Sequence, residues 1–144
     1  MTSLSTLNLT GYKSIKNLES LTLGPLNVLI GVNGAGKSNL ISFFRLLSRI
    51  VEGTGNLQLH IGRQGGGSSF LFEGSLVTSH IKASLTFQNN NKINEYSFDL
   101  DHAAKDTLIF AEESYRSYRF EKPTNWIKLG SGHKETEILN HQDL

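Results

Sequence analysis

A glycine-rich segment near the N-terminus carries the residues best suited to chemistry. Residues 31–38 read Gly-Val-Asn-Gly-Ala-Gly-Lys-Ser, which is the pattern G-x-x-x-x-G-K-[ST]. In such a loop, glycines let backbone N–H groups turn inward around a di- or triphosphate. Lys37 would bring a positive charge to the β- and γ-phosphates, and the Ser38 hydroxyl can ligate Mg²⁺. The spacing predicts a nucleotide-binding loop, and the alternative is a glycine-rich turn without a ligand.

The segments on either side of this loop have the order that such a site needs, strand then loop then helix. Residues 26–30 form a short apolar run after Gly24-Pro25, which predicts a strand buried on both faces. Residues 37–51 have helical periodicity and precede Gly53, with apolar positions at Leu40, Phe43, Phe44, Leu47 and Val51. The N-terminus of this helix would direct unpaired amides and its dipole at bound phosphates.

The rest of the chain is predicted to be mostly β-structure. Two strands, around 4–9 and 21–30, are joined by residues 11–14, and helical periodicity ends after Gly53. Beyond a flexible stretch at 65–69, alternation predicts a hairpin with its turn at 89–92 and arms at 81–87 and 96–100. Short strands are expected at 107–111, 118–120 and 126–129. We divide the chain into a nucleotide-binding core, 1–58, and a β-rich lobe, 59–144, of the same incomplete domain.

Composition limits the functional classes. The chain has 144 residues, a formal net charge of +1, no cysteine and a mean hydropathy of −0.24. We therefore expect a cytoplasmic protein without a membrane span, a disulfide framework or a thiolate metal site. The charge does not indicate nucleic-acid binding. The interleaved aromatics and arginines of residues 115–120 favour a half-buried strand with Arg116 facing water over a nucleic-acid surface. The five histidines lack ligand spacing, which predicts surface or hairpin positions.

The loop and its surroundings resemble a known family. Residues 31–39, Gly-Val-Asn-Gly-Ala-Gly-Lys-Ser-Asn, follow Gly-Tyr-Lys-Ser-Ile at 11–15 and Leu-Gly-Pro-Leu-Asn-Val-Leu-Ile at 23–30. This arrangement resembles the SMC/RecF-type ATPase heads and, more narrowly, bacterial AAA-family ATPases of the AAA_21/OLD-like kind. The resemblance is strong over about the first 50 residues and extends to about Leu129 only in general character.

The resemblance implies an α/β fold, the N-terminal lobe of a P-loop NTPase of the ABC/SMC-head type with a β-rich antiparallel segment. It implies ATP and Mg²⁺ as cofactors, Lys37 as the catalytic residue and Ser38 as the metal ligand. The residues that would cradle the phosphates are Asn33, Gly34, Ala35, Gly36, Lys37 and Ser38. Asn39 would cap the loop, and Lys13 and Ser14 would lie near the nucleotide or, alternatively, form a solvent-facing turn.

The same resemblance implies partners and a process. A second head docked face to face would make the full-length protein a homo-oligomer, with a nuclease as a possible partner. Nucleic acid remains a possible ligand. Proteins of this type act in DNA repair or anti-phage defence.

The family's remaining catalytic parts are not found in this sequence. Residues 108–113 are the nearest match to its acidic strand, but Glu112 replaces the expected Asp, which favours a β-strand with two exposed acids. Residues 129–133 predict a turn and not a signature loop. We therefore expect the Walker B, signature and switch residues to lie outside this chain, and the 144 residues alone not to hydrolyse ATP.

Two other functions stay open. A GTPase or small-molecule kinase uses the same loop, although residues 91–94, Asn-Lys-Ile-Asn, lack the final Asp of a guanine-reading motif. A non-catalytic module could bind a nucleotide only to fix its shape for a partner.

Overall fold

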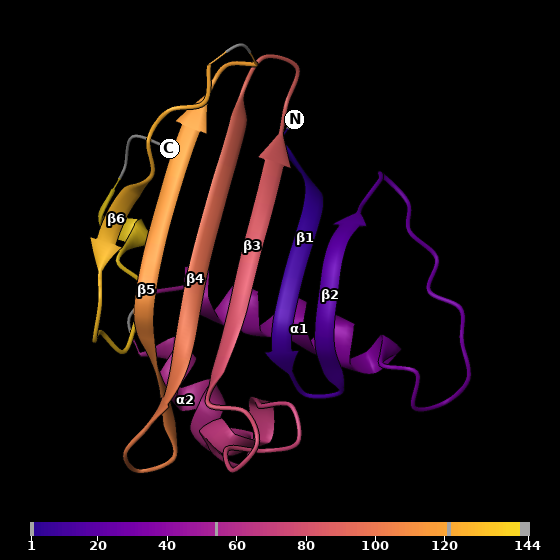
Figure 1. The fold of residues 1–144 in the computed structure, drawn as a ribbon, viewed down its shortest axis with the longest axis vertical. Helices are drawn as coiled ribbons and strands as arrows, with labels where there is room; N and C mark the ends of the chain where they lie inside the picture. Colours follow the sequence, from indigo (N-terminus) through magenta and orange to yellow (C-terminus); the bar gives the residue numbers. More distant parts are fainter. Residues whose placement is uncertain (1, 54, 121, 142–144) are drawn as a thin grey trace.

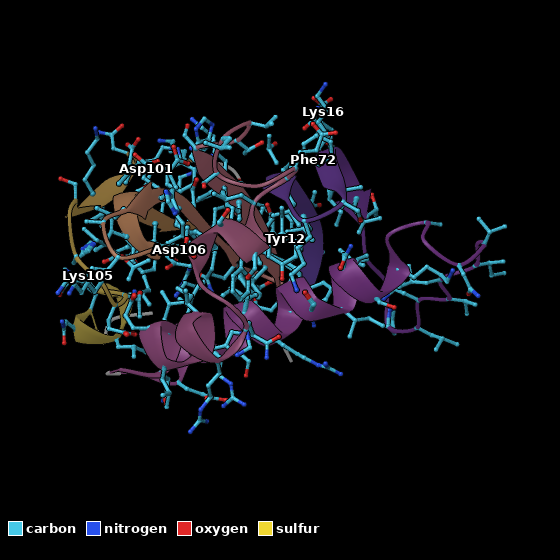
Figure 2. The ribbon with its side chains drawn as sticks, turned by 90° about the horizontal axis from the view of Figure 1, so that it is seen from below. Tyr12, Lys16, Phe72, Asp101, Lys105 and Asp106 are labelled. Carbon is cyan, nitrogen blue, oxygen red and sulfur yellow. The ribbon has the colours of Figure 1, made fainter. Side chains whose placement is uncertain are left out.

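The computed structural model describes residues 2–53, 55–120 and 122–141. Its main element is a six-stranded sheet in the order β2-β1-β3-β4-β5-β6, in which all neighbouring strands are antiparallel. Two α-helices lie on one face of this sheet (Figures 1 and 2). The strands are β1 (Ser3–Tyr12), β2 (Ile15–Thr22), β3 (His80–Gln88), β4 (Ile93–Ala103), β5 (Thr107–Tyr118) and β6 (Ile127–Gly130). The helices are α1 (Lys37–Val51) and α2 (Asn56–Arg63), with short 3-10 turns η1 (Gly67–Phe70) and η2 (Ile138–Asn140).

The core lies between the sheet and the two helices. Every second residue of the central strands is buried there, as for Leu7 and Leu9 in β1, because side chains alternate between the two faces of a strand. The helix predicted at 37–51 is confirmed. Its fully buried residues are Phe43, Leu46 and Ile50, whereas Val51 is exposed. Phe44, Leu47 and Val51 instead line an apolar groove of about 550 Å³ between α1 and the sheet.

The predicted hairpin is confirmed as β3 and β4. Asn89 closes its turn, since the Asn89 amide donates to the Lys92 carbonyl at 3.0 Å and the Asn89 side chain accepts from the Lys92 amide at 2.8 Å. The strand predicted at 126–129 corresponds to β6. The segment predicted at 107–111 is the first part of the longer strand β5, which ends at Tyr118. The strand predicted at 118–120 is wrong, because only Tyr118 belongs to β5 and residues 119 and 120 lie outside any strand.

The strand predicted at 26–30 is wrong. Residues 23–36 form no helix or strand, β2 ends at Thr22, and the connection to α1 runs outward beyond the edge of the sheet (Figure 1). The side chain of Asn27 bonds both the amide and the carbonyl of Gly24 at 2.9 Å, which closes a local turn at the start of the apolar run. Among the described residues no neighbouring strand pairs with this run.

The sequence does not predict the second helix, α2. Its eight residues have little helical periodicity, and glycines lie close to both of its ends. It buries only Leu57 and Ile61. Its first amides are capped from far along the chain, since Glu135 accepts from Leu57 N at 3.3 Å and Gln58 N at 3.2 Å. A cap 77 residues away leaves no local sequence signal.

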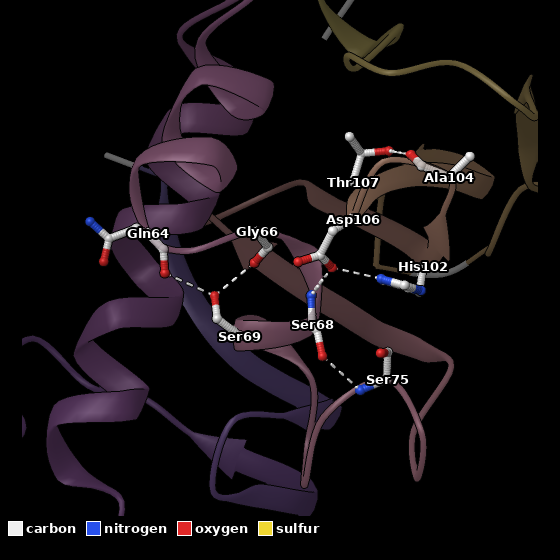
Figure 3. Close-up of polar contacts among 9 residues, drawn as sticks. All are labelled: Gln64, Gly66, Ser68, Ser69, Ser75, His102, Ala104, Asp106 and Thr107. Atoms are coloured by element: carbon white, nitrogen blue, oxygen red, sulfur yellow. Dashed lines mark hydrogen bonds and ion pairs between the residues drawn. The ribbon is translucent and has the colours of Figure 1, made fainter.

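The stretch predicted to be flexible, residues 65–69, is held by the β4–β5 hairpin (Figure 3). The Asp106 carboxylate accepts from Ser68 N at 2.7 Å and lies 2.7 Å from His102 Nε2. The Gly67 amide donates to the Asp106 carbonyl at 2.6 Å. A Cβ at Gly66 would stand 2.0 Å from the Asp106 carboxylate, so glycine is needed there for close approach.

The division at residues 58 and 59 falls inside α2. One sheet joins β1 and β2 with the four strands that come after this division. The antiparallel segment expected in the second half therefore continues into the first 22 residues.

Candidate functional site: the glycine loop at the start of α1

The loop at 31–36 leads directly into α1 and leaves the start of this helix uncapped by side chains. Gly34 and Gly36 have φ angles of 87° and 89°, a left-handed conformation that favours glycine. Gly36 is the N-cap residue of α1. Among the described residues, no side chain caps the start of this helix with a hydrogen bond. The first N–H groups of a helix have no partner inside it. They are available here to an acceptor outside the protein.

A polar cavity adjoins these amides. Its volume is about 340 Å³, and its lining residues are Asn33, Gly34, Gly36, Lys37, Ser38 and Asn39. Within the loop, the Ala35 amide donates to the Val32 carbonyl at 3.2 Å. The cavity therefore combines a cationic side chain, a hydroxyl, an amide side chain and a helix N-terminus, the groups that recognise a phosphate.

Lys37 reaches back across the loop from the first position of α1. Its ammonium donates to the carbonyl oxygens of Gly31 at 2.5 Å and Val32 at 2.7 Å. A Cβ at Gly31 would lie 3.2 Å from Ala35 Cβ and 3.7 Å from this ammonium, so the loop is closed tightly around it. An ammonium has three donors, which leaves one for an anion in the cavity.

Ser14 lies against the loop, although it comes from the β1–β2 turn. Its hydroxyl oxygen accepts from Asn39 Nδ2 at 2.7 Å and lies 3.2 Å from where a Cβ at Gly36 would stand. It also lines a second cavity of about 330 Å³ with Gly36 and Lys37. The structure thus brings Ser14 and Asn39 together beside the phosphate-binding groups, and the Ser14 hydroxyl keeps its own proton for a further acceptor.

Lys13 does not accompany Ser14. Its ammonium lies 5.1 Å from the centre of the Phe70 ring and 5.7 Å from that of Tyr12, away from the residues that line the two loop cavities. Burial lowers the pKa of Lys13. The backbone explains the difference, because Lys13 has a φ of 47° and its amide donates to the Phe70 carbonyl at 2.9 Å. The prediction that Lys13 lies near the nucleotide has no support from this geometry.

The acidic strand differs from expectation at one of its two residues. Glu112 is exposed and lies 3.6 Å from Lys128, as expected of a surface acid. Glu113 is fully buried, with the hydroxyls of Tyr96 and Thr136 donating to one carboxylate oxygen. The Glu137 amide donates to the other oxygen at 3.0 Å, and His133 Nε2 lies 3.3 Å from it.

A β-bulge in β5 explains why Glu113, and not Glu112, points into the core. Leu100 pairs with Phe110 and Asp99 with Glu112, so Ala111 is an extra residue in β5. Without it, alternation from Phe110 would point Glu112 inward. The bulge turns Glu113 inward instead, where burial and its carboxylate also raise the pKa of Tyr96. Among the described residues, the partners of Glu113 come from β4 and residues 133–137 and not from the glycine loop.

Two other surface expectations are corrected. The Arg116 side chain is mostly covered, since it pairs with Glu95 and its guanidinium lies 4.6 Å from the centre of the Trp126 ring. His133 is also largely covered, against Phe110 and Glu113.

Within the described residues, no group of three or more histidine, aspartate or glutamate side chains is arranged to hold a metal.

None of the helices in the described part of the chain has the length and apolar character that crossing a membrane requires.

Comparison with known proteins identifies the family. No curated protein matches the sequence significantly. Residues 26–131 match the model of a family described as "AAA domain, putative AbiEii toxin, Type IV TA system". The match spans most of the chain, including the glycine loop, α1 and the strands β3 to β5. The chain therefore belongs to the AAA_21 family of AAA domains.

Proposed function

We propose that this chain binds Mg·ATP through residues 31–39 as the N-terminal part of an SMC/RecF-like ATPase. The observation that carries the proposal is the start of α1. Its amides have no side-chain cap, two glycines before it are left-handed, and Lys37 lines the cavity beside it. Such an arrangement stabilises negative charge.

The chain's own residues have distinct roles in this proposal. The amides at 34–38 bind phosphate oxygens, Lys37 neutralises charge at the β- and γ-phosphates, and the Ser38 hydroxyl would hold Mg²⁺. Mg²⁺ supplies charge neutralisation and orientation of the phosphates when it is bound. Ser14 and Asn39 fix the loop from its outer side.

Hydrolysis by this chain alone is not part of the proposal. Phosphoryl transfer needs an acid that orients water or helps to hold Mg²⁺. Glu113 is the nearest sequence match to such an acid, and its carboxylate is occupied by four protein groups in the core. We infer that the acidic strand, signature and switch residues belong to other parts of the full-length protein.

The biological setting rests on the resemblance to this class of proteins. We propose a cytoplasmic ATPase that works as a homo-oligomer of heads, in DNA repair or anti-phage defence, with a nuclease as a possible partner. The family description names a putative toxin of a type IV toxin–antitoxin system. A role in such a system is compatible with anti-phage defence.

Titration of labelled ATP with Mg²⁺ tests the nucleotide site. Lys37→Ala should abolish measurable binding, because it removes the cation at the phosphates, while the fold should survive the loss of two loop contacts. Arg45→Ala is the matched control, an exposed cation on the same helix outside the loop cavities. Equal affinities of wild type and Lys37→Ala would overturn the assignment.

Competition between nucleotides separates this proposal from the GTPase alternative. We expect ATP to bind more tightly than GTP, because residues 91–94 lack the aspartate that reads guanine. In the structure Asn91 and Lys92 form a hairpin turn, and Ile93 and Asn94 begin β4. Tenfold tighter binding of GTP, about 1.4 kcal/mol, would favour a GTPase.

A further inference from the structure

A small polar cavity lies between α1 and α2, well away from the glycine loop. Its volume is about 100 Å³, and its lining residues are Arg49, Asn56, Leu59, His60 and Arg63. Arg49 follows Lys37 by twelve positions along α1, which corresponds to roughly 18 Å of helix. The cavity is therefore separate from the nucleotide site.

The spacing of the lining residues shows how the two helices form the cavity. Asn56, Leu59, His60 and Arg63 stand at positions i, i+3, i+4 and i+7, which places them on one face of α2. Arg49 comes from the last turn of α1 and meets this face. Two arginines, a histidine and an asparagine thus line one cavity.

The charges around the cavity are mainly positive. Burial lowers the pKa of His60, and the positive charges of Arg49 and Lys13 lower it further. Glu52 opposes them, since its carboxylate pairs with Arg49 at 2.6 Å. Arg63 has no ion pair among the described residues. An anion in the cavity would relieve the repulsion among these cations.

We propose that this cavity binds a single phosphoryl group. Its volume suits one tetrahedral anion and excludes a nucleoside, whose base would remain outside. Arginine donors in a fork match phosphate oxygens, and the Asn56 amide and the His60 ring can supply further donors. The phosphoryl group can belong to free phosphate, a nucleotide or a nucleic acid, and the chemistry at the cavity is the same.

Binding is measured in the Lys37→Ala background, which removes phosphate binding at the glycine loop. Inorganic phosphate, AMP and a short oligothymidylate are titrated separately, with the His60 ring signal followed by NMR as the local readout. We expect phosphate or AMP to shift this signal saturably and to raise the pH at which His60 titrates. Because the readout does not involve ATP, it is independent of the proposed nucleotide function.

Four substitutions test the geometry. Arg49→Gln and Arg63→Gln should each weaken binding by about five- to tenfold, through loss of a charge-assisted hydrogen bond. Glu52→Gln should tighten it by about two- to threefold, because it releases Arg49 and removes a negative charge. Arg45→Gln, one turn earlier on α1 and outside the cavity, should change nothing.

Three results would overturn the proposal. The first is the absence of a saturable shift with both phosphate and AMP. The second is an equal effect of Arg45→Gln and Arg63→Gln, which would indicate a diffuse basic surface. The third is binding of the oligothymidylate alone, which would indicate a nucleic-acid surface without a phosphoryl pocket.

Discussion

The interior of the sheet and the segment before the glycine loop both contain apolar side chains, which lie in opposite environments. Leu7 and Leu9 of β1 are fully buried, whereas Leu26, Val28 and Ile30 are 84%, 73% and 90% exposed. In β1 leucines alternate with polar residues, whereas residues 26–30 are apolar except for Asn27. The difference shows that an apolar run becomes a strand only where neighbouring strands accept its backbone hydrogen bonds. In the described residues β1 has two such neighbours and residues 26–30 have none.

The largest expected effect comes from truncating the same kind of residue in the two regions. Leu9→Ala should lower the free energy of unfolding by about 3 to 4 kcal/mol, because it leaves a cavity in the core. Ile30→Ser should change it by less than about 0.5 kcal/mol, since the side chain is already in solvent. Urea denaturation measures both. A loss of several kcal/mol in Ile30→Ser would show that residues 26–30 are packed in solution.

The two adjacent acids of β5 give a second test, which compares a buried carboxylate, that of Glu113, with an exposed one, that of Glu112. Glu113→Gln should cost about 2 to 3 kcal/mol, because it removes the charge that four buried groups surround. Glu112→Gln should stay within about 0.5 kcal/mol, as expected of an exposed ion pair. Thermal and urea unfolding of the pair give the comparison. ATP turnover that disappears in a fully folded Glu113→Gln protein would instead identify Glu113 as catalytic.

These pairs also show what the sequence could and could not predict. Helix α1, the β3–β4 hairpin and β6 follow local periodicity and turn residues, and all three were predictable. The inward turn of Glu113 depends on a bulge at Ala111, and α2 depends on a cap from Glu135, so both arise from distant pairing. At the candidate site, local periodicity predicted that α1 begins at Lys37, directly after Gly36, whereas the roles of Lys37 and Ser38 in nucleotide binding stay predictions.

The contact between the β1–β2 turn and the loop does not follow from the local pattern, because one side chain, Ser14, makes it with a residue 25 positions away. Of the two neighbours Lys13 and Ser14, only Ser14 reaches the loop. The left-handed backbone at Lys13 decides this, and no composition or periodicity signals it.

A smaller effect is expected where the sheet meets the loop. Ser14→Ala should weaken ATP binding by about fivefold, because the Asn39 side chain loses its hydrogen-bond acceptor and the loop loses its contact with the β1–β2 turn. Ser14→Thr keeps the hydroxyl and should restore the affinity. Thr10→Ala, which removes an exposed contact with Asn17 in the same hairpin, is the control. An unchanged affinity in Ser14→Ala would show that the sheet and the loop are independent.

The smallest effect concerns the polar contacts that hold residues 65–69. The hydrogen bond from His102, followed by that from the Ser68 amide, lowers the pKa of Asp106. A lowered carboxylate pKa stabilises the folded state above the unfolded-chain value, and this contribution is lost as the pH falls through the folded value. Protection of the Ser68 amide against exchange, measured relative to its intrinsic rate at each pH, should therefore fall in acid. Asp106→Asn should remove this pH dependence, and Asp101→Asn, on the same hairpin, should retain it.

The cap that Glu135 provides for α2 has a consequence for the order in which the chain folds. The bond joins residues 78 positions apart, and Gln58 makes two more such contacts, with the carbonyls of Leu108 and Lys134. Contacts of high sequence separation form late, because a long loop must close first. During synthesis α2 leaves the ribosome well before Glu135 exists. We expect its first turn to fray until β5 and the residues after β6 have docked, so that α2 becomes ordered only as the last part of the sheet closes.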